Sequence, residues 1–415
     1  MSFADLGLSP RLLDAVARSG YVAPTPIQAQ AIPIALAGRD LIVSSQTGSG
    51  KSAAFILPTL QRLIDRPAAK RGPGQAARVL ILAPTRELAG QITDCIRCYG
   101  QFTNLRSTAI YGGVSQFGQE KALRRGVDLI VATPGRLGDL LRQGLVRLDQ
   151  VEVLILDEAD RMLDMGFLPE VQRIIAQLPV ERQTLLFSAT IPPTIARLTS
   201  QIMSRPHTLS LVPTRTEAAR IEEQVYLTEK AQKSRLLIEL IGHQQVTRAI
   251  VFTRMKHGAD RLVKELHRHG IRACAFHGNK SQGARQRTLA DFRTPNPPLL
   301  IATDVAARGI DVDDVSHVFN YDLPADPETY VHRIGRTGRA GASGTAISFC
   351  QPDERGALRS IERFVRRPLV VARLVPAQRA DQVPSGERVK TADREMGPTR
   401  FGRAGRTKSA AGSPG

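Results

Sequence analysis

The chain has 415 residues, of which 42% are hydrophobic and 23% charged, proportions typical of a soluble globular protein with two or three domains. No apolar run is long enough to span a membrane, and four cysteines agree with a reducing compartment, so we expect a cytoplasmic protein with no membrane partner. The formal net charge of +18 indicates a polyanionic partner. With 5% aromatic residues and no tryptophan, we expect contacts to its phosphate backbone rather than continuous base stacking.

The first segment, residues 3–20, predicts the entry of a helix, because Ser9 can cap it and Pro10 suits its first turn. Residues 20–28 (GYVAPTPIQ) then break the chain and restart it with two prolines, which fix the backbone so that Gln28 begins a helix in one defined place. A carboxamide placed so rigidly can pair with the N6/N7 edge of adenine. An ordinary surface position on a helix is the alternative.

A phosphate-binding loop is predicted between a strand and a helix. Residues 41–43 (LIV) form a short apolar run, residues 46–52 (QTGSGKS) follow, and apolar residues at helical spacing come next. The glycines let backbone N–H groups approach phosphate oxygens, and the helix N-terminus adds partial positive charge. Lys51 would contact the β- and γ-phosphates, and Ser52 would ligate Mg²⁺. The strict pattern has glycine where this chain has Ser45, so the loop alone is a weaker signal.

A pair of carboxylates follows the buried strand predicted for residues 153–156 (VLIL). Asp157 and Glu158 emerge at its carboxyl end, the edge where doubly wound sheets bind ligands. Asp157 is the candidate ligand of the Mg²⁺ that bridges the β- and γ-phosphates, and Glu158 is placed to orient or deprotonate the attacking water. A solvated acidic turn is the alternative, and it fits Asp160 and Asp164 better. Loop and strand together predict hydrolysis of a nucleoside triphosphate.

Three further strand ends carry small hydroxyls, glycines or arginines where a helix begins, a pattern typical of phosphate contacts. Each alone predicts a turn, but three in one sheet predict a track for a second polyanion, separate from the nucleotide. The residues are Pro84, Thr85, Arg86, Gly112, Gly113, Thr133, Pro134, Gly135 and Arg136. Another strand, at residues 185–190, ends in two hydroxyls, those of Ser188 and Thr190.

The apolar pattern lapses around residues 204–223, which we interpret as a linker between two halves. The second half repeats the alternation of strands and helices, with a helix predicted at 258–269 and strands at 249–252, 272–276 and 299–302.

Residues 332–339 (HRIGRTGR) space three arginines three positions apart. One helical turn would place Arg333, Arg336 and Arg339 on one face, where three cations are costly unless an anion arrives. Arg336 and Arg339 are therefore candidate arginine fingers for a γ-phosphate, and a solvated basic face is the alternative. From residue 376 onward the composition, rich in Ala, Gly, Pro and Ser with scattered arginines, predicts disorder.

Residues 157–160 spell DEAD, and with the motifs above the chain resembles the DEAD-box ATP-dependent RNA helicases over residues 1–370. The resemblance implies an α/β fold of two tandem RecA-like domains, each a mostly parallel sheet flanked by helices, with ATP and Mg²⁺ as cofactors. It implies that Phe3 and Gln28 recognise adenine, and that Ser188, Thr190 and His332 couple hydrolysis to strand separation. The ATP-binding residues that it implies are Phe3, Gln28, Gln46, Thr47, Gly48, Ser49, Gly50, Lys51, Ser52 and Asp311.

The same resemblance implies that the three strand ends of the first half contact the RNA backbone, and that five residues of the second half do so as well: Thr253, Gln282, Arg285, Thr303 and Asp304. The opening MSFADLGLSP and the short basic tail resemble the bacterial RhlE-type subgroup. Two positions depart from the family, Ser45 where alanine is usual and Ser52 where threonine is usual. Because both keep the size and Ser52 keeps the hydroxyl, we expect them to affect rate more than activity.

We expect residues 1–208 to form the first domain, 209–222 the linker, 223–375 the second domain and 376–415 a disordered basic tail. The predicted function is local, ATP-dependent unwinding or remodelling of RNA duplexes and ribonucleoproteins with little sequence preference. An ATP-gated RNA clamp or annealing chaperone is the alternative, and a DNA helicase is disfavoured by the family resemblance. We expect a monomer, with ribosome-assembly or RNA-decay proteins as candidate partners.

Overall fold

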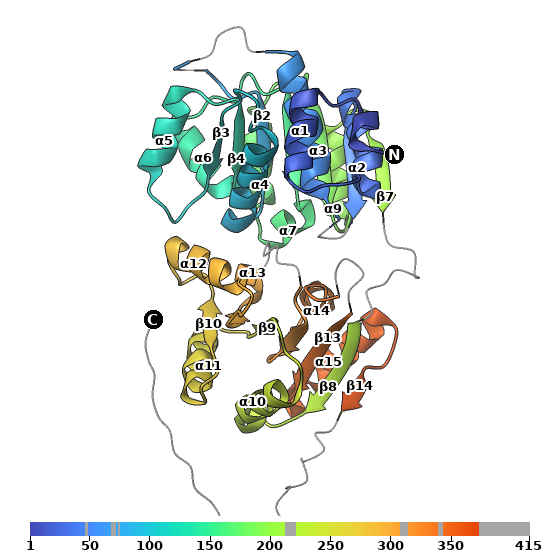
Figure 1. Ribbon diagram of the computed structural model, residues 1–415, viewed down its shortest axis with the longest axis vertical. Helices are drawn as coiled ribbons and strands as arrows, with labels where there is room; N and C mark the ends of the chain where they lie inside the picture. The colour runs from blue at the N-terminus through green and yellow to red at the C-terminus, as the bar shows by residue number, and fades with distance from the viewer. Residues whose placement is uncertain are drawn as a thin grey trace, which may run out of the picture. The chain divides into compact units, whose positions relative to one another are not determined.

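The computed structural model describes residues 1–45, 49–67, 72–73, 75–211, 221–307, 314–338 and 343–372. Gln46, Thr47, Gly48, Asp311 and Arg339 lie outside this part of the chain, as do residues 212–220 and 376–415. The described residues form two seven-stranded sheets of parallel strands flanked by helices (Figure 1). This arrangement confirms the predicted fold class of two tandem RecA-like domains.

The first sheet takes its strands from the N-terminal half: β1 (Leu41–Ser45), β2 (Val79–Leu82), β3 (Ser107–Ile110), β4 (Leu129–Ala132), β5 (Val153–Asp157), β6 (Gln183–Ser188) and β7 (His207–Leu211). Its helices are η1 (Phe3–Leu6), α1 (Pro10–Arg18), α2 (Pro26–Leu36), α3 (Lys51–Asp65), α4 (Arg86–Tyr99), α5 (Gln116–Arg125), α6 (Pro134–Arg142), α7 (Ala159–Asp164), α8 (Leu168–Ile175) and α9 (Pro193–Ile202).

Both faces of this sheet are covered, which is why its central strands read as unbroken apolar runs. In β2, Val79 and Ile81 pack into the cluster formed with α1 to α4, which lie over one face (Figure 1). Leu80 and Leu82 point the other way, into the cluster formed with α6 to α9. A strand buried on both sides cannot show the polar alternation of a half-exposed strand, so its period carries little information.

The order of strands in the first sheet is β3-β4-β2-β5-β6-β1-β7. The nucleotide residues predicted from the sequence follow β1 and β5, and the coupling residues lie at the end of β6, which pairs with both. The predicted RNA residues follow β2, β3 and β4, which are also neighbours. Because all these strands are parallel, both sets emerge at one edge of the sheet, divided between β2 and β5.

The second sheet has the order β10-β11-β9-β12-β13-β8-β14. Its strands are β8 (Ile221–Leu227), β9 (Ala249–Phe252), β10 (Ala273–Phe276), β11 (Leu299–Ala302), β12 (His317–Asn320), β13 (Gly344–Cys350) and β14 (Val370–Ala372). Its helices are η2 (Lys230–Gln232), α10 (Lys233–His243), α11 (Lys256–Arg268), α12 (Gln282–Phe292), α13 (Asp304–Ala307), α14 (Pro327–Ile334), η3 (Pro352–Glu354) and α15 (Arg355–Val365).

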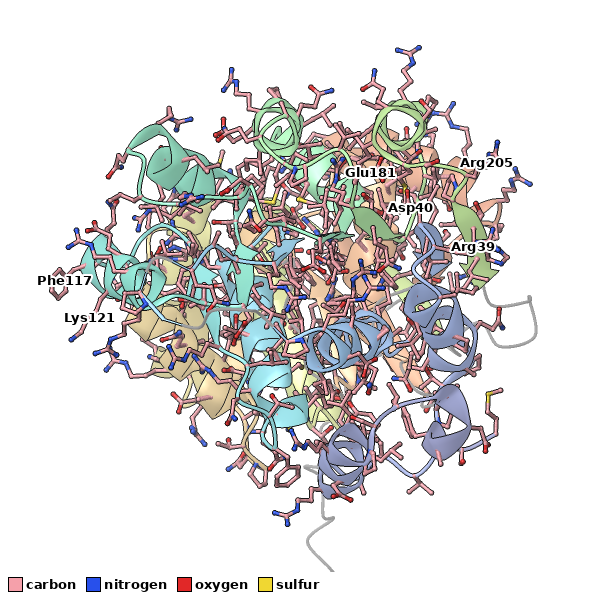
Figure 2. All side chains as sticks on the ribbon, turned by 90° about the horizontal axis from the view of Figure 1, so that it is seen from above. Arg39, Asp40, Phe117, Lys121, Glu181 and Arg205 are labelled. Atoms are coloured by element: carbon pink, nitrogen blue, oxygen red, sulfur yellow. The ribbon has the colours of Figure 1, made fainter. Side chains whose placement is uncertain are left out.

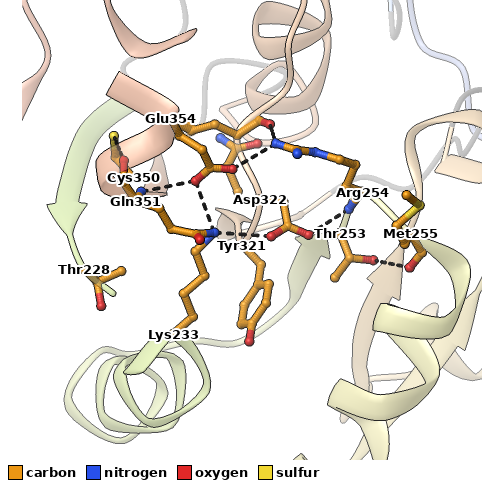
Figure 3. A network of polar contacts seen from close by, with 12 residues as sticks. Thr228, Lys233, Thr253, Arg254, Met255, Tyr321, Asp322, Cys350, Gln351 and Glu354 are labelled. Carbon is orange, nitrogen blue, oxygen red and sulfur yellow. Dashed lines mark hydrogen bonds and ion pairs between the residues drawn. The ribbon is translucent and has the colours of Figure 1, made fainter. Parts of the chain in front are cut away.

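A buried lysine joins several strand ends of the second sheet (Figure 3). Lys233, 1% exposed, lies 3.2 Å from the carboxylates of both Asp322 and Glu354. Asp322 also accepts a hydrogen bond of 2.9 Å from the backbone of Arg254, whose guanidinium donates to Glu354 at 2.9 Å. The network therefore connects Arg254, which follows β9, to Asp322 after β12 and to Glu354 after β13.

Two details differ from the sequence-based prediction. The predicted helix begins at Pro10 with Ser9 as its N-cap, as expected, whereas residues 3–6 form a separate short helix, η1, that ends at Gly7, whose φ of 76° places it in the left-handed region. The predicted linker, residues 209–222, overlaps the end of β7 and the start of β8, and its remaining residues, 212–220, lie outside the described part of the chain. Among the described residues, no helix combines the length and apolar character needed to cross a bilayer.

Candidate nucleotide and RNA site

Lys51 begins α3 directly after Gly50, which caps the helix with a φ of 90°. The lysine side chain is 8% exposed, and its Nζ donates a 2.7 Å hydrogen bond to the carbonyl of Ser45 at the end of β1. Burial lowers the pKa of Lys51, while the charges of nearby carboxylates, that of Asp157 first, oppose this shift. The ammonium is thus held inside the loop and close to the acidic residues at the end of β5.

Gln28 lies against the phosphate-binding loop, fully buried. Its Nε2 donates to the carbonyl of Gly50 at 3.2 Å, and its Oε1 accepts from the backbone N–H of Thr25 at 2.9 Å. The Thr25 hydroxyl donates to the carbonyl of Ser49 at 3.0 Å. A Cβ atom at Gly50 would lie 2.6 Å from Gln28 Nε2, so glycine is required at this close approach. The surface-helix alternative for Gln28 is therefore wrong, since the side chain contacts the loop.

Asp157 is the last residue of β5 and is 3% exposed. Burial, with the neighbouring charge of Glu158, raises the pKa of Asp157 to about 7, although the Lys51 charge opposes this. The backbone N–H of Glu158 donates to one oxygen of the Asp157 carboxylate at 3.0 Å. A carboxylate whose charge is this costly to bury would be stabilised by a cation beside it, such as a divalent metal ion.

Glu158 is paired with an arginine that the sequence did not single out. Its carboxylate lies 2.6 Å from Arg161, and the two side chains are 9% and 6% exposed. The Glu158 backbone has a φ of 52°, in the left-handed region that is uncommon for residues with a side chain. Held at both backbone and side chain, the carboxylate is fixed at the strand end where an attacking water would lie.

Asp160 is buried rather than solvated, so the acidic-turn interpretation is wrong for this residue. Its Oδ2 accepts hydrogen bonds from the backbone N–H groups of Ala189 and Thr190, at 3.1 and 2.9 Å, and from the Thr190 hydroxyl at 3.1 Å. The Asp160 N–H donates to the Ser188 hydroxyl at 3.1 Å. The interpretation fits Asp164, which is exposed. The DEAD segment and the end of β6 therefore form one hydrogen-bonded unit.

On the RNA side of the edge, two arginines meet at a pair of glycines. A Cβ atom at Gly113 would lie 1.7 Å from Arg86 Nη1, which shows how closely the guanidinium covers this backbone. Gly112 lies near both Arg86 and Arg136, and Arg136 donates to the carbonyl of Val114 at 3.4 and 3.5 Å. The predicted residues that follow β2, β3 and β4 are therefore brought together, with two guanidinium groups at the centre.

The two threonines among the predicted RNA residues, Thr85 and Thr133, are also the N-caps of helices. Thr85 is the N-cap of α4, and its side chain accepts a 3.2 Å hydrogen bond from the N–H of Leu88. Thr133 takes the corresponding N-cap position of α6, followed by Pro134 at its first turn. Both threonines thus begin helices at the sheet edge, where helix N-termini favour phosphate groups.

Arg333 and Arg336 do not share one helical face, so the prediction is wrong for this pair, and Arg339 lies outside the described residues. Helix α14 ends at Ile334, with Gly335 as its C-cap. Arg333 is 2% exposed and forms a double contact with Asp304, at 2.5 and 2.8 Å. Arg336 follows beyond the helix and is 6% exposed. Arg333 thus joins α14 to the end of β11, and Asp304 is paired with it.

Gln282 and Arg285, predicted to bind RNA, contact a carboxylate of the first half of the chain. Gln282 Nε2 donates to Glu87 at 3.0 Å, and Arg285 lies 2.9 Å from the same carboxylate. All three side chains are buried. Glu87 lies on the first turn of α4 beside Arg86, so this contact reaches the predicted RNA track.

The remaining predicted residues are placed as follows. Thr253 and Thr303 are both buried at the ends of β9 and β11, which pair with each other. Phe3 is also buried, 6.3 Å from Tyr21 between ring centroids. Ser52 lies in the first turn of α3 and His332 in the last turn of α14. Sequence reasoning missed Glu87 and Arg161, whose only signal was a charge beside a recognised motif. It named Arg333 as one of three spaced arginines but did not predict its pairing with Asp304.

Comparison with known protein families gives two matches. A family model described as "DEAD/DEAH box helicase" matches residues 25–198, and one described as "Helicase conserved C-terminal domain" matches residues 232–341. The chain is 42% identical over 367 residues to "ATP-dependent RNA helicase CshA" of Limosilactobacillus reuteri, covering 88% of this chain and 72% of that one. It is 43% identical over 366 residues to "DEAD-box ATP-dependent RNA helicase 30" of Arabidopsis thaliana, covering 88% and 62%.

Solved structures give the same result. The fold is similar to that of S. cerevisiae Dbp5 bound to RNA and ADP BeF3, with a TM-score of 0.77, 35% identity, and coverage of 89% of this chain and 95% of that one. It is also similar to a DEAD box protein from the hyperthermophile Methanococcus jannaschii, with a TM-score of 0.52, 36% identity, and coverage of 90% and 99%.

Proposed function

Because the chain belongs to the DEAD-box family of ATP-dependent RNA helicases, we propose residue roles for its coupling of ATP hydrolysis to RNA unwinding or remodelling. One observation supports them most. The nucleotide residues and the RNA residues of the first sheet emerge at one edge from two adjacent sets of strands, β5-β6-β1 and β3-β4-β2. Two polyanions can therefore bind side by side on one rigid support.

The nucleotide is held by Gln28 and the loop that ends in Lys51. The Lys51 ammonium exchanges the Ser45 carbonyl for phosphate oxygens when ATP binds. Glu158, fixed by Arg161, positions the attacking water, and an arginine supplied by residues 336–339 stabilises charge that develops on the γ-phosphate. The candidates for this arginine are Arg336 and Arg339. Arg339 lies outside the described residues, as do the proposed ATP contacts Gln46, Thr47, Gly48 and Asp311.

Mg²⁺ fits the residues present, and we propose Asp157 and Ser52 as its protein contacts. Both offer hard oxygen atoms, which this cation prefers, and the buried Asp157 carboxylate gains from a neighbouring positive charge. The ion would neutralise charge between the β- and γ-phosphates. Asp157 would bind a cation as the ionised carboxylate, the form that the Lys51 charge nearby favours.

RNA is held through its backbone by Arg86, Arg136 and the glycines between them, together with Thr85 and Thr133. Side chains and helix N-termini that bind phosphates carry no sequence information, so we propose low sequence specificity. Gln282 and Arg285 support this track indirectly through Glu87. Thr253, Thr303 and Asp304 lie at the ends of neighbouring strands and form the corresponding surface of the second sheet.

The subgroup, the cellular location, the oligomeric state and the partners are further proposals. The RhlE-type subgroup was inferred from the N-terminal segment and the tail, whereas several relatives carry the name CshA, and we favour that type. Four free cysteines support a reducing, cytoplasmic location. We propose a monomer with partners from ribosome assembly or RNA decay. The domain boundaries expected at residues 208 and 222 are adjusted to the end of β7 at Leu211 and the start of β8 at Ile221, and the third is kept at residue 375.

The experiment compares RNA-stimulated ATP hydrolysis in three variants. Lys51→Ala should lose roughly 10²–10³-fold in turnover, the effect of removing one donor to a developing anion. Glu158→Gln should still bind ATP and RNA, because it keeps the side-chain shape and Asp157, but the bound complex should persist without hydrolysis. Lys230→Ala, at an exposed lysine of η2, is the control and should behave as the unmodified protein. Normal turnover in Lys51→Ala would overturn the nucleotide-site assignment.

A further inference from the structure

Helix α5 carries the most exposed phenylalanine described in the first half of the chain, and the roles proposed above leave it unused. Phe117 is 73% exposed. Figure 2 shows its ring and the Lys121 side chain projecting from α5 away from the body of the protein. The two residues are four positions apart, so they lie on the same side of the helix. An aromatic ring exposed to this extent offers a flat apolar face on which a base can stack.

The helix is continuous with the proposed RNA track. The loop between β3 and α5 contains Gly112 and Gly113, over which Arg86 lies, and the carbonyl of Val114 accepts from Arg136. Phe117 follows three residues after Val114, in the first turn of α5. The first turn of α5 is therefore joined by a short loop to the backbone that the two arginines contact.

Glutamine side chains fix α5 in place. Gln119 is 7% exposed and donates to the carbonyl of Tyr111 at 3.0 Å, which ties the helix to the end of β3. Gln116 donates to Gln143, the C-cap of α6, at 2.7 Å. Because the helix is anchored to the loop before it and to the helix that carries Arg136, the Phe117 ring is a preformed surface rather than a group on a free loop.

The charges around the ring indicate which kind of partner fits. Helix α5 has the sequence QFGQEKALRR, in which Lys121, Arg124 and Arg125 are basic and Glu120 is the one acidic residue. Glu120 is already engaged, by Gln116 at 2.9 Å and by Arg124 at 3.5 Å. A basic helix with an exposed aromatic ring suits a single-stranded nucleic acid, whose bases stack on the ring while its phosphates contact the cations.

We propose that Phe117 and Lys121 form an accessory binding site for single-stranded RNA, in which a base stacks on Phe117 and an adjacent phosphate contacts Lys121. The proposal rests on the RNA track proposed above and extends it by a contact to a base. It also modifies the expectation that stacking plays no continuous part in binding, since one ring at the end of a backbone track adds a single stacked position.

The test measures the binding of labelled oligoadenylates from about 4 to about 16 nucleotides, the range of site sizes typical of single-strand binding folds, in the presence of ADP and beryllium fluoride. Affinity for the unmodified protein should rise with length until the accessory site is filled. Phe117→Ala should lose this gain, about fivefold or more, the loss expected for one stacked base at 1 kcal/mol or above. Phe117→Trp should retain it.

An abasic position moved along the longest oligoadenylate locates the stacked base. One position should weaken binding in the unmodified protein and have no effect in Phe117→Ala. Lys121→Gln should lower the slope of log affinity against log salt concentration by about 0.7, the value for one phosphate contact on a single strand. Phe364→Ala is the matched control, a half-exposed phenylalanine on the basic helix α15, and should bind every length normally.

Equal length dependence in Phe117→Ala and the unmodified protein would overturn the accessory site and would leave the ring for a protein partner. The proposed function is tested separately, by the stimulation of ATP hydrolysis in the unmodified protein by the shortest oligoadenylate that binds. If RNA stimulates ATP hydrolysis but the affinity of the unmodified protein does not rise with RNA length, the proposed RNA track is kept and only the site on α5 is rejected. An absence of stimulation at saturating RNA would overturn the proposed function and the accessory site with it.

Discussion

Asp160 and Thr190 are joined by two hydrogen bonds, from the backbone N–H at 2.9 Å and from the hydroxyl at 3.1 Å, both to the same carboxylate oxygen. Ala189 adds a third bond to that oxygen. The two segments lie 30 residues apart in sequence and follow adjacent strands, β5 and β6. Any shift of Thr190 must therefore move the segment that contains Asp157 and Glu158, or break three bonds to one charged group.

Replacing Asp160 by asparagine tests this connection. Both carboxylate oxygens of Asp160 accept from N–H groups, so Asp160→Asn would set an amide donor against a donor and leave a buried group unsatisfied. We expect a loss of about 1–3 kcal/mol in unfolding free energy and a fall in strand displacement per ATP hydrolysed. Asp164→Asn, at an exposed aspartate of the same helix, is the control. Equal behaviour of the two variants in duplex-displacement assays would contradict the role given to Asp160.

Arg285 is expected to act through Glu87 rather than through RNA, and a double-mutant cycle separates the two. If the 2.9 Å ion pair is its main contact, Arg285→Ala should weaken RNA-stimulated ATP hydrolysis much less in a Glu87→Ala background than alone. We expect a coupling energy of at least about 1 kcal/mol in kcat/KM for RNA. Arg287→Ala, at an exposed arginine of α12, is the control. An Arg285→Ala effect that is the same in both backgrounds would identify Arg285 as an RNA contact.

Lys233 should dominate the stability of the second sheet's polar network. Lys233→Ala leaves the buried Glu354 and the partly buried Asp322 without the ammonium that both contact, and removing one partner of a buried pair costs about 3–5 kcal/mol. Arg235→Ala, two residues along the same helix in an exposed pair with Glu239, should cost less than about 1 kcal/mol. Urea unfolding followed by circular dichroism measures both. A Lys233→Ala variant as stable as Arg235→Ala would mean that the network contributes little.

His317 gives the second sheet a predictable response to acid. Burial lowers the pKa of His317 below its usual value of 6.5, against the charge of Glu222, and its ring stacks on Phe319 at 6.0 Å. Below pH 6.5 the unfolded chain therefore takes up a proton that the folded chain does not, and stability falls as pH decreases. The slope cannot exceed about 1.4 kcal/mol per pH unit for one proton.

His317→Gln should flatten the dependence of unfolding free energy on pH below 6.5, because it removes this titration. His269→Gln is the control, since His269 lies on the surface after α11. Urea unfolding of the three proteins at a series of pH values provides the comparison. If the profile of His317→Gln is as steep as that of the unmodified protein, the acid response has another source.

The strands that the sequence predicted correctly are those buried on both faces, such as β2, β5 and β11, whose apolar runs have no interruption. Strand β8 was not predicted, because its residues IEEQVYL mix exposed and buried positions and resemble a linker. Helix α14 was extended too far, since the arginine spacing continues through Gly335 while the helix does not. The spacing of apolar residues predicts an element only where the buried positions are also the apolar ones.

The nucleotide residues could be located from the sequence because the loop and the carboxylates are local patterns with a chemical reason for each residue. Their partners could not. Glu87 meets Arg285 across nearly 200 positions, and Arg333 meets Asp304 only because α14 follows β12 at a particular angle. Gln28 was placed correctly in sequence but its contact with Gly50 depends on how α2 packs beside the loop. Tertiary partners are set by the fold, and a single sequence does not display them.

The position of β3 at the border of the first sheet has a consequence for how such proteins can diversify. Strand β3 has one neighbour, β4, whereas β1, β5 and β6 each have two. Changes in the β3 loop or in α5 therefore disturb few backbone hydrogen bonds, while changes beside the nucleotide disturb a strand on either side. New preferences for RNA can arise at this border by small surface substitutions, and the hydrolytic machinery in the interior of the sheet is left intact.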